Sequence, residues 1–138
     1  MKLCDETITV FNKQWDSNTG YDVYYPTVIK GVSWFSEITS NVEETGLLAA
    51  NKFTIRIPTD ADFSGKSYVT PKAYESSDHT KVFTLGNGDI IVKGAVVPQA
   101  GQSLKPSDLQ KAYGEIVTIL GVTDDRRGWS PHWKVVGK

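Results

Sequence analysis

The sequence predicts an all-β domain, an antiparallel β-barrel or sandwich with one short helix near the C-terminal third and long inter-strand loops. Two observations predict this class. Several short segments alternate polar and apolar residues with the period of two that half-buried strands show. Clusters of turn-forming residues separate these segments. The chain has 138 residues, which is enough for one hydrophobic core, so we expect residues 1–138 to form a single β-barrel-like domain.

The first two strands are expected to form a hairpin. The segment from Thr7 to Phe11 alternates and is rich in β-branched residues, which predicts a strand with Ile8 and Val10 facing inward. Residues 15–25 predict the turn and the returning strand. Pro26 has no N–H for a ladder, so we expect this strand to be interrupted there, with the chain bending or running along a sheet edge.

Two further strands follow. A long, bent strand is expected from Val28 to Ile38, with Gly31 marking a bulge. Its apolar residues share one parity: Val28, Val32, Trp34 and Ile38. After a turn at residues 41–46, the clearest strand of the sequence alternates from Leu47 to Ile57 until Pro58 ends the ladder.

The segment from Thr59 to Lys81 breaks the strand pattern. It is rich in Asp, Ser, Gly and Pro, and its apolar anchors are scattered. We expect a long excursion that contains a short strand around Ser67 to Thr70. Loops of this length are uncommon inside compact domains and are often functional when they occur.

The remaining elements follow from turn chemistry and composition. An early Pro, an acidic first turn and a final Gly predict the helix, and a segment that is apolar on both parities predicts a strand covered on both faces. In order, we expect a tight turn at Leu85–Asp89, a strand at Ile90–Val97, a loop at Pro98–Lys105, the helix at Lys105–Gly114, the covered strand at Glu115–Val122, a turn at Asp124–Gly128 and a last strand at His132–Val136.

Charge and cysteine content narrow the function classes. The chain has 15 basic and 16 acidic residues, so no long-range field would attract nucleic acid or an anionic membrane. Cys4 is the only cysteine, which excludes an internal disulfide. The N-terminal residues lack the apolar stretch of a signal peptide, so synthesis and residence in a cytosol are expected.

No pattern indicates a catalytic, metal or cofactor site. Asp60 to Gly65 resembles the start of a calcium loop, but Pro71 stands where the closing carboxylate is required, so a solvated turn is favoured. Gly86-Asn87-Gly88 precedes β-branched residues rather than a helix, which favours a hairpin turn over a phosphate loop. His79 and His132 have no activating neighbours in sequence. We therefore expect no enzyme, no cofactor and no metal.

Aromatic and charged residues supply the candidate contacts with a partner. The aromatic residues from Trp15 to Phe35, with Trp129 and Trp133, are favoured as core or cross-strand pairs over ligand platforms. The charged turn at residues 124–127 is favoured as a solvated loop, with partner contacts by its arginines as the alternative. The possible partner-interface residues are Asp60, Asp62, Lys66, Tyr68, Arg126, Arg127 and Trp129.

Most of the chain resembles a known group of proteins. The segments concerned are the hairpin at Thr7–Tyr25, Ile29–Trp34, Lys52–Pro58, Asn87–Gly94, Tyr113–Val117 and Pro131–Val135. With these segments the chain resembles minor capsid proteins of tailed phages (siphophages) and prophages of Gram-positive bacteria. Those proteins belong to the head and neck of the virion. The order of elements also resembles the head-tail joining or head-closure β-barrels. In those proteins an opening hairpin precedes a strand ending near Ile-Pro, and a Gly-Asp-Ile-Ile strand follows.

The resemblance implies a virion structural protein without catalysis, a head-tail connector that closes the neck by ring assembly. Implied partners are further copies of itself in a ring homo-oligomer, portal or adaptor proteins, and tail proteins. Membrane contact is not implied, and packaged DNA would be touched at most locally. The protein would be synthesised in the bacterial host cytoplasm and end in the virion neck. The loops at residues 59–81 and 98–105 would be able to order on a neighbour, before or during assembly.

Other functions stay open at this stage. A carbohydrate- or protein-binding β-sandwich module would use the aromatic residues. A tail completion or minor tail protein would share the same small β-rich design. A small hydrolase without a recognisable motif is the third alternative.

Overall fold

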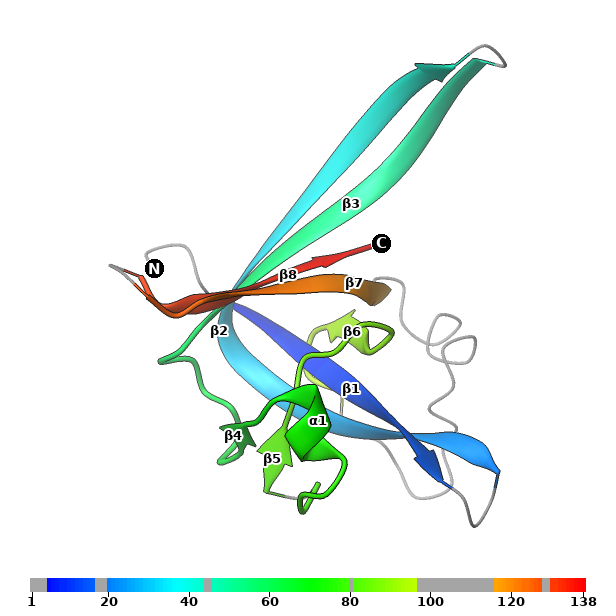
Figure 1. Ribbon diagram of the computed structural model, residues 1–138. Coiled ribbons are helices and arrows are strands. Elements are labelled where there is room, and N and C mark those ends of the chain that lie inside the picture. The colour runs from blue at the N-terminus through cyan, green and yellow to red at the C-terminus, as the bar shows by residue number, and fades with distance from the viewer. Residues whose placement is uncertain (1–4, 17–19, 44–45, 80, 97–115, 128–129) are drawn as a thin grey trace.

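A computed structural model confirms the all-β class (Figure 1). It describes residues 5–16, 20–43, 46–79, 81–96, 116–127 and 130–138. The helix predicted at residues 105–114, the loop predicted at 98–105 and Trp129 lie outside the described residues.

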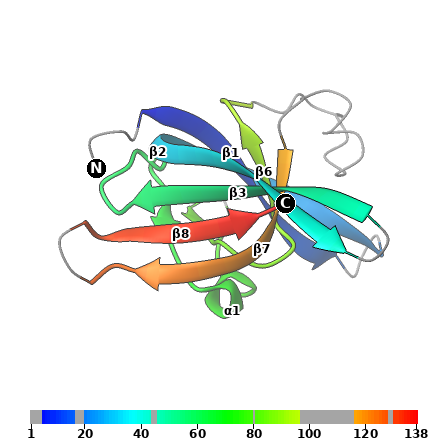
Figure 2. The same ribbon diagram turned by 90° about the horizontal axis from the view of Figure 1, so that it is seen from above.

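The described chain contains eight strands and one short helix. The strands are β1 (Glu6–Asp16), β2 (Tyr21–Glu43), β3 (Gly46–Pro58), β4 (Ser67–Tyr68), β5 (Val82–Phe83), β6 (Ile90–Lys93), β7 (Ile116–Asp125) and β8 (His132–Gly137), and the helix is α1 (Pro71–Tyr74). Six strands pair antiparallel in the order β1-β2-β3-β8-β7-β6, and β6 also pairs with β1. The ladder therefore closes on itself as an irregular barrel. Figure 2 shows β3, β8 and β7 side by side in this arrangement.

Alternating apolar residues fill the barrel. Ile8 and Val10 are fully buried, as their pattern predicts. Burial of each such side chain contributes about 1.5–3 kcal/mol relative to exposure. The main core consists of Ile8, Val10, Ile29, Val32, Ile55, Ile57, Phe83, Leu85, Ile91, Ile119, Trp133 and Val135. A second cluster contains Phe11, Ile90, Val92 and Val96.

β2 runs through Pro26 without a break, so the predicted interruption is wrong. Pro26 pairs opposite Phe11 of β1. On the other side of β2, pairing with β3 begins only at Ser33. β2 is therefore an edge strand at Pro26, which is the alternative that the sequence allowed, and an edge strand tolerates a missing N–H.

Gly31 forms the predicted bulge. Its φ is +90°, a conformation that favours glycine, and the register with β1 passes from Lys30 to Val32 without it. The extra residue reverses the parity of the buried face, because successive residues point to opposite faces. Ile29 is buried before the bulge and Val32 after it, whereas Val28 is only partly buried. The single parity predicted from Val28 onward is therefore wrong before the bulge.

The excursion between β3 and β6 packs against the barrel. The predicted short strand is present as β4, which pairs in parallel with β5. Figure 1 shows both strands and α1 gathered on one side of the barrel. Tyr74 is fully buried, and Phe63 and Tyr68 pack against the core. Helix α1 was not predicted, although Thr70 accepts the N–H of Ala73 at 3.3 Å and proline follows this cap.

β2 and β3 extend beyond the barrel as a two-stranded ribbon (Figure 1). β1 pairs with β2 only as far as Val32, and β8 pairs with β3 only from Phe53 onward. Residues 37–43 and 46–52 therefore pair only with each other among the described residues, and we call this ribbon the arm. The turn predicted at residues 41–46 is too long, because Glu43 already pairs with Gly46.

Three smaller expectations also change. The tight turn at Leu85–Asp89 is present, but it is not a hairpin turn, because β5 pairs with β4 while β6 pairs with β1 and β7. β6 ends at Lys93, before a Gly94 with φ +104°. β7 is not covered on both faces, since its burial alternates and Leu120, at a register shift, is 57% exposed.

Candidate functional site

Two of the predicted partner residues, Tyr68 and Arg126, are brought together at the end of β7. The guanidinium carbon of Arg126 lies 5.7 Å from the centre of the Tyr68 ring and 5.4 Å from that of Trp133. The two rings are themselves 4.6 Å apart. A cation near aromatic faces is attracted by their negative electrostatic potential. Arg126 is thus held against the barrel, and Trp133, which the sequence indicated only as an aromatic of the last strand, belongs to this cluster.

A carboxylate completes the cluster. Asp124 accepts hydrogen bonds from Nε and Nη2 of Arg126, the shortest at 2.7 Å. The hydrogen bonds and charge of Arg126 lower the pKa of Asp124. Both side chains are about half exposed. The turn therefore has the local pairing expected of a solvated loop.

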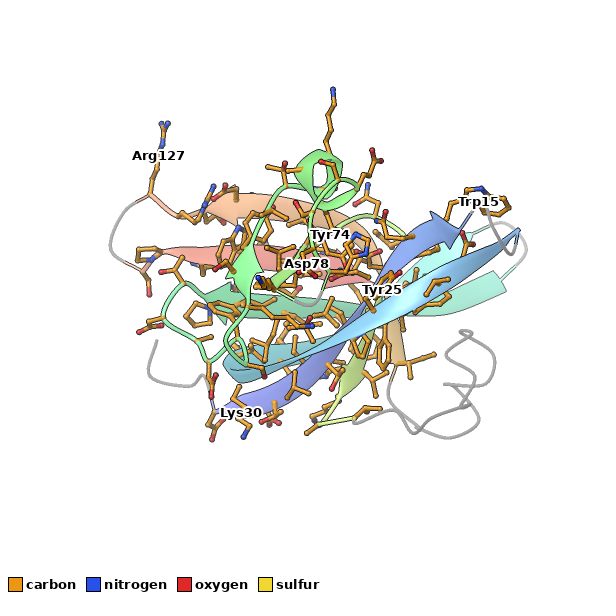
Figure 3. All side chains as sticks on the ribbon, turned by 90° about the horizontal axis from the view of Figure 1, so that it is seen from below. Trp15, Tyr25, Lys30, Tyr74, Asp78 and Arg127 are labelled. Carbon is orange, nitrogen blue, oxygen red and sulfur yellow. The ribbon has the colours of Figure 1, made fainter. Side chains whose placement is uncertain are left out.

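The other candidate residues that the structure describes do not join this cluster. Asp60 and Asp62 are exposed in the excursion. Arg127 is exposed, and Figure 3 shows its side chain extending away from the barrel, at the end opposite Trp15. The predicted partner residues thus form one compact pair, with the others dispersed.

Lys66 covers the outer edge of β2. Its Nζ donates to the carbonyl oxygen of Pro26 at 2.8 Å and to Oγ1 of Thr27 at 2.9 Å. Burial lowers the pKa of Lys66. Ser64 covers the next position by donating its hydroxyl to the carbonyl oxygen of Val28 at 2.7 Å. Lys66 is therefore engaged within the chain.

Asp62 extends this cover. Its backbone exchanges two hydrogen bonds with Lys30, each 2.9 Å long. Its side chain accepts the N–H of Ser64 at 3.0 Å and so closes a local turn. The described residues contain no group of three or more His, Cys, Asp or Glu side chains that could hold a metal ion. Together the excursion residues occupy the β2 edge of the barrel, which would otherwise be open to strand pairing.

Asp89 performs a similar task on β1. It is 5% exposed and accepts hydrogen bonds from the backbone N–H of Lys13, the backbone N–H of Gly86 and Nδ2 of Asn12, each 3.0 Å long. Asn12 in turn bonds both the carbonyl oxygen and the N–H of Thr84. Burial raises the pKa of Asp89, although these donors oppose the rise. The network fastens the outer part of β1, beyond its pairing with β6.

A cavity of about 580 Å³ opens beside this network. Charged side chains at its wall come from Lys13, Glu75, Asp89 and Asp124. None of the described residues that line it is His, Cys or Ser. Among the described residues of this wall, no Ser–His or Cys–His pair is therefore present.

The two histidines are packed in the structure. The His79 ring lies 4.2 Å from the Tyr74 ring and 4.5 Å from the Tyr25 ring, and its Nε2 is 2.9 Å from the carbonyl oxygen of Tyr74. Nδ1 of His132 lies 2.6 Å from the carbonyl oxygen of Ser130. Each histidine ring therefore contacts a backbone carbonyl oxygen of its own chain.

These features define an all-β protein in which side chains cover parts of the β1 and β2 edges of the barrel, and the arm edges pair with no other described strand. Residues 3–138 match the model of a family of unknown function, DUF6751, so the chain belongs to that family. No curated protein and no solved structure matches it. Within the described residues, no helix has the length and apolar character needed to cross a membrane.

Proposed function

We propose that the protein is a virion structural protein of a tailed phage or prophage, a minor capsid protein of the neck. In this role it assembles into a ring with further copies of itself and acts as a head-tail connector. It contacts portal or adaptor proteins on one side and tail proteins on the other. The sequence resemblance supports the phage setting.

The arm is the observation that carries the assembly role. A two-stranded ribbon is at best marginally stable alone in water. Its two outer edges carry backbone N–H and C=O groups that pair with no other described strand. Such edges are templates for pairing with another chain. The barrel covers part of its β2 edge with Asp62, Ser64 and Lys66, whereas the edges of the arm pair with no other described strand, which supports an arm that meets a partner.

The sequence of the arm agrees with a partner contact. On β2 the parity of buried Val32 continues to Ile38 and Val42. On β3 the parity of buried Ile55 continues back to Ala49 and Leu47. Apolar residues therefore continue at the core-facing positions of β2 and β3 into the arm, beyond the pairing with β1 and β8.

Electron microscopy and light scattering of the purified full chain test this function. We expect rings, either from the protein alone or after mixing with a portal–adaptor complex. A strict monomer that ignores such complexes and shows saturable glycan binding would contradict the proposal and support a carbohydrate-binding module.

A genetic test addresses the same role in the particle. Particles made without the protein should be poorly filled with DNA or lack tails. Normal infectious virions in its absence would exclude an essential closure role.

A further inference from the structure

We propose that neighbouring copies of this chain join arm to arm, with the outer edge of β3 in one copy pairing antiparallel with the outer edge of β2 in the next. This inference rests on the proposed ring assembly. It adds the interface by which the ring closes.

Among the described residues, the outer edges of the arm pair with no other strand. In the barrel, the edge of β2 is occupied by Asp62, Ser64 and Lys66, and the edge of β1 by Asp89. In the arm, the described backbone shows pairing only between β2 and β3. A strand that pairs with the arm must itself have an unpaired edge. The arm of a second copy has such an edge, and its length equals that of the first arm.

The two edges of the arm differ in charge. The β2 side of the arm, residues 37–43, contains Glu37 and Glu43 and no basic residue. The β3 side, residues 46–52, contains Lys52 and no acidic residue. Two β2 edges would bring like charges together, whereas a β3 edge beside a β2 edge brings opposite charges together. Charge complementarity therefore selects the β3-to-β2 contact.

The contact also has a defined symmetry. A β3-to-β2 contact uses two different surfaces, so it is heterologous, and repetition of such a contact gives a closed ring when the rotation between copies closes. Because β2 and β3 are antiparallel within each arm, the new contact is antiparallel as well, which continues one sheet from copy to copy. A pairing of two β2 edges would instead stop at a dimer.

Cross-linking between two single-cysteine variants tests the contact. In a Cys4→Ser background, one variant carries Ser40→Cys on β2 and the other Ala49→Cys on β3, two positions that pair within one arm. The variants carry tags of different mass and are treated with a short bis-maleimide. We expect the mixture to give several-fold more covalent dimer than either variant alone. Asp60→Cys, in the exposed turn of the barrel, is the matched control and should not cross-link.

The outcomes separate this inference from the proposed function. Dimers formed equally well by Ser40→Cys alone would show β2-to-β2 pairing and overturn the inference. Rings seen by microscopy without arm cross-links would overturn it while leaving the ring function intact. A full chain that stays monomeric in sedimentation, both alone and with a portal–adaptor complex, would overturn both.

Charge reversal gives an independent readout. The variant Glu37→Lys/Glu43→Lys has two basic edges, and Lys52→Glu has two acidic edges. Each alone should lose ring formation roughly fivefold or more at low salt, since each unfavourable cross-strand charge pair acts at every contact. Mixing the two should restore rings of alternating copies. Loss without restoration on mixing, with the barrel of both variants still folded, would contradict the arm contact.

Discussion

Replacing Asp89 with alanine removes the carboxylate that fastens the turn before β6 to the outer part of β1. Its oxygens accept three hydrogen bonds of 3.0 Å each. Alanine would leave the backbone N–H groups of Lys13 and Gly86 without this acceptor. Asn12 would keep its 2.6 Å bond to the carbonyl oxygen of Thr84. The substitution therefore orphans two backbone donors at a site where the carboxylate itself is 5% exposed.

The expected loss of stability follows from these two donors. A buried donor without a partner costs about 1–3 kcal/mol. Burial of the charged carboxylate, which raises the pKa of Asp89, offsets part of what its hydrogen bonds contribute. Because both donors are only partly buried, we expect the free energy of unfolding to fall by about 1–3 kcal/mol. A domain of this size has about 5–15 kcal/mol in total, so the change is easily measured.

Urea unfolding followed by tryptophan fluorescence measures this loss. The unfolding midpoint should fall, while the dependence of the free energy on urea stays constant. Asp60→Ala, at an exposed position, is the control and should change stability by no more than about 0.5 kcal/mol. An effect of Asp89→Ala no larger than that of the control would refute the reasoning about the buried network.

Three further predictions concern pH and glycines. The pKa of Asp89 is raised in the folded chain above the unfolded value of about 3.9. The loss of unfolding free energy caused by Asp89→Ala should therefore be largest below about pH 4 and shrink as pH rises through the folded-state pKa. A loss that grows with pH would contradict this. Gly31→Val should lower the free energy of unfolding by about 1–2 kcal/mol, because φ is +90°, whereas Gly121→Ala, whose added Cβ meets nothing within 4 Å, should be tolerated in the same urea experiment. Gly137→Ala should cost about 1–3 kcal/mol, since its Cβ would lie 2.6 Å from the carbonyl oxygen of Thr118, and a thermal midpoint equal to that of the unchanged chain would show that β8 can shift freely.

Local patterns were sufficient to predict the barrel strands. The alternation in β1, β3 and β8 reports burial on one face, and that is the property the barrel uses. The sequence predicts a bulge at Gly31. A bulge also reverses the parity of the buried face, so Ile29 rather than Val28 faces the core before it. α1 was missed because its four residues are too few for a helical period to show.

The arm could not be predicted as an arm. A strand that leaves the barrel keeps the same alternation as a strand within it, so the pattern through Ile38 and Leu47 does not report where the neighbouring strands stop. The register of β1 and β8 decides this, and register depends on contacts distant in sequence.

The candidate contacts were predicted in part. Tyr68 and Arg126 were selected for residue type, and the structure brings them together. Asp89 and Asn12 were not selected, because a buried polar residue is recognised only by its partners, and these are about 75 positions away in sequence.

A comparison of the full chain with a chain that lacks the arm tests most directly the claim that the arm carries assembly. Glu37 and Lys52 pair across the arm, so residues 38–51 can be replaced by Asn-Gly, which makes a two-residue hairpin turn. Sedimentation velocity should show ring-sized assemblies for the full chain and a folded monomer for the shortened chain. Equal assembly of both chains, or a full chain that is monomeric both alone and with a portal–adaptor complex, would contradict the claim.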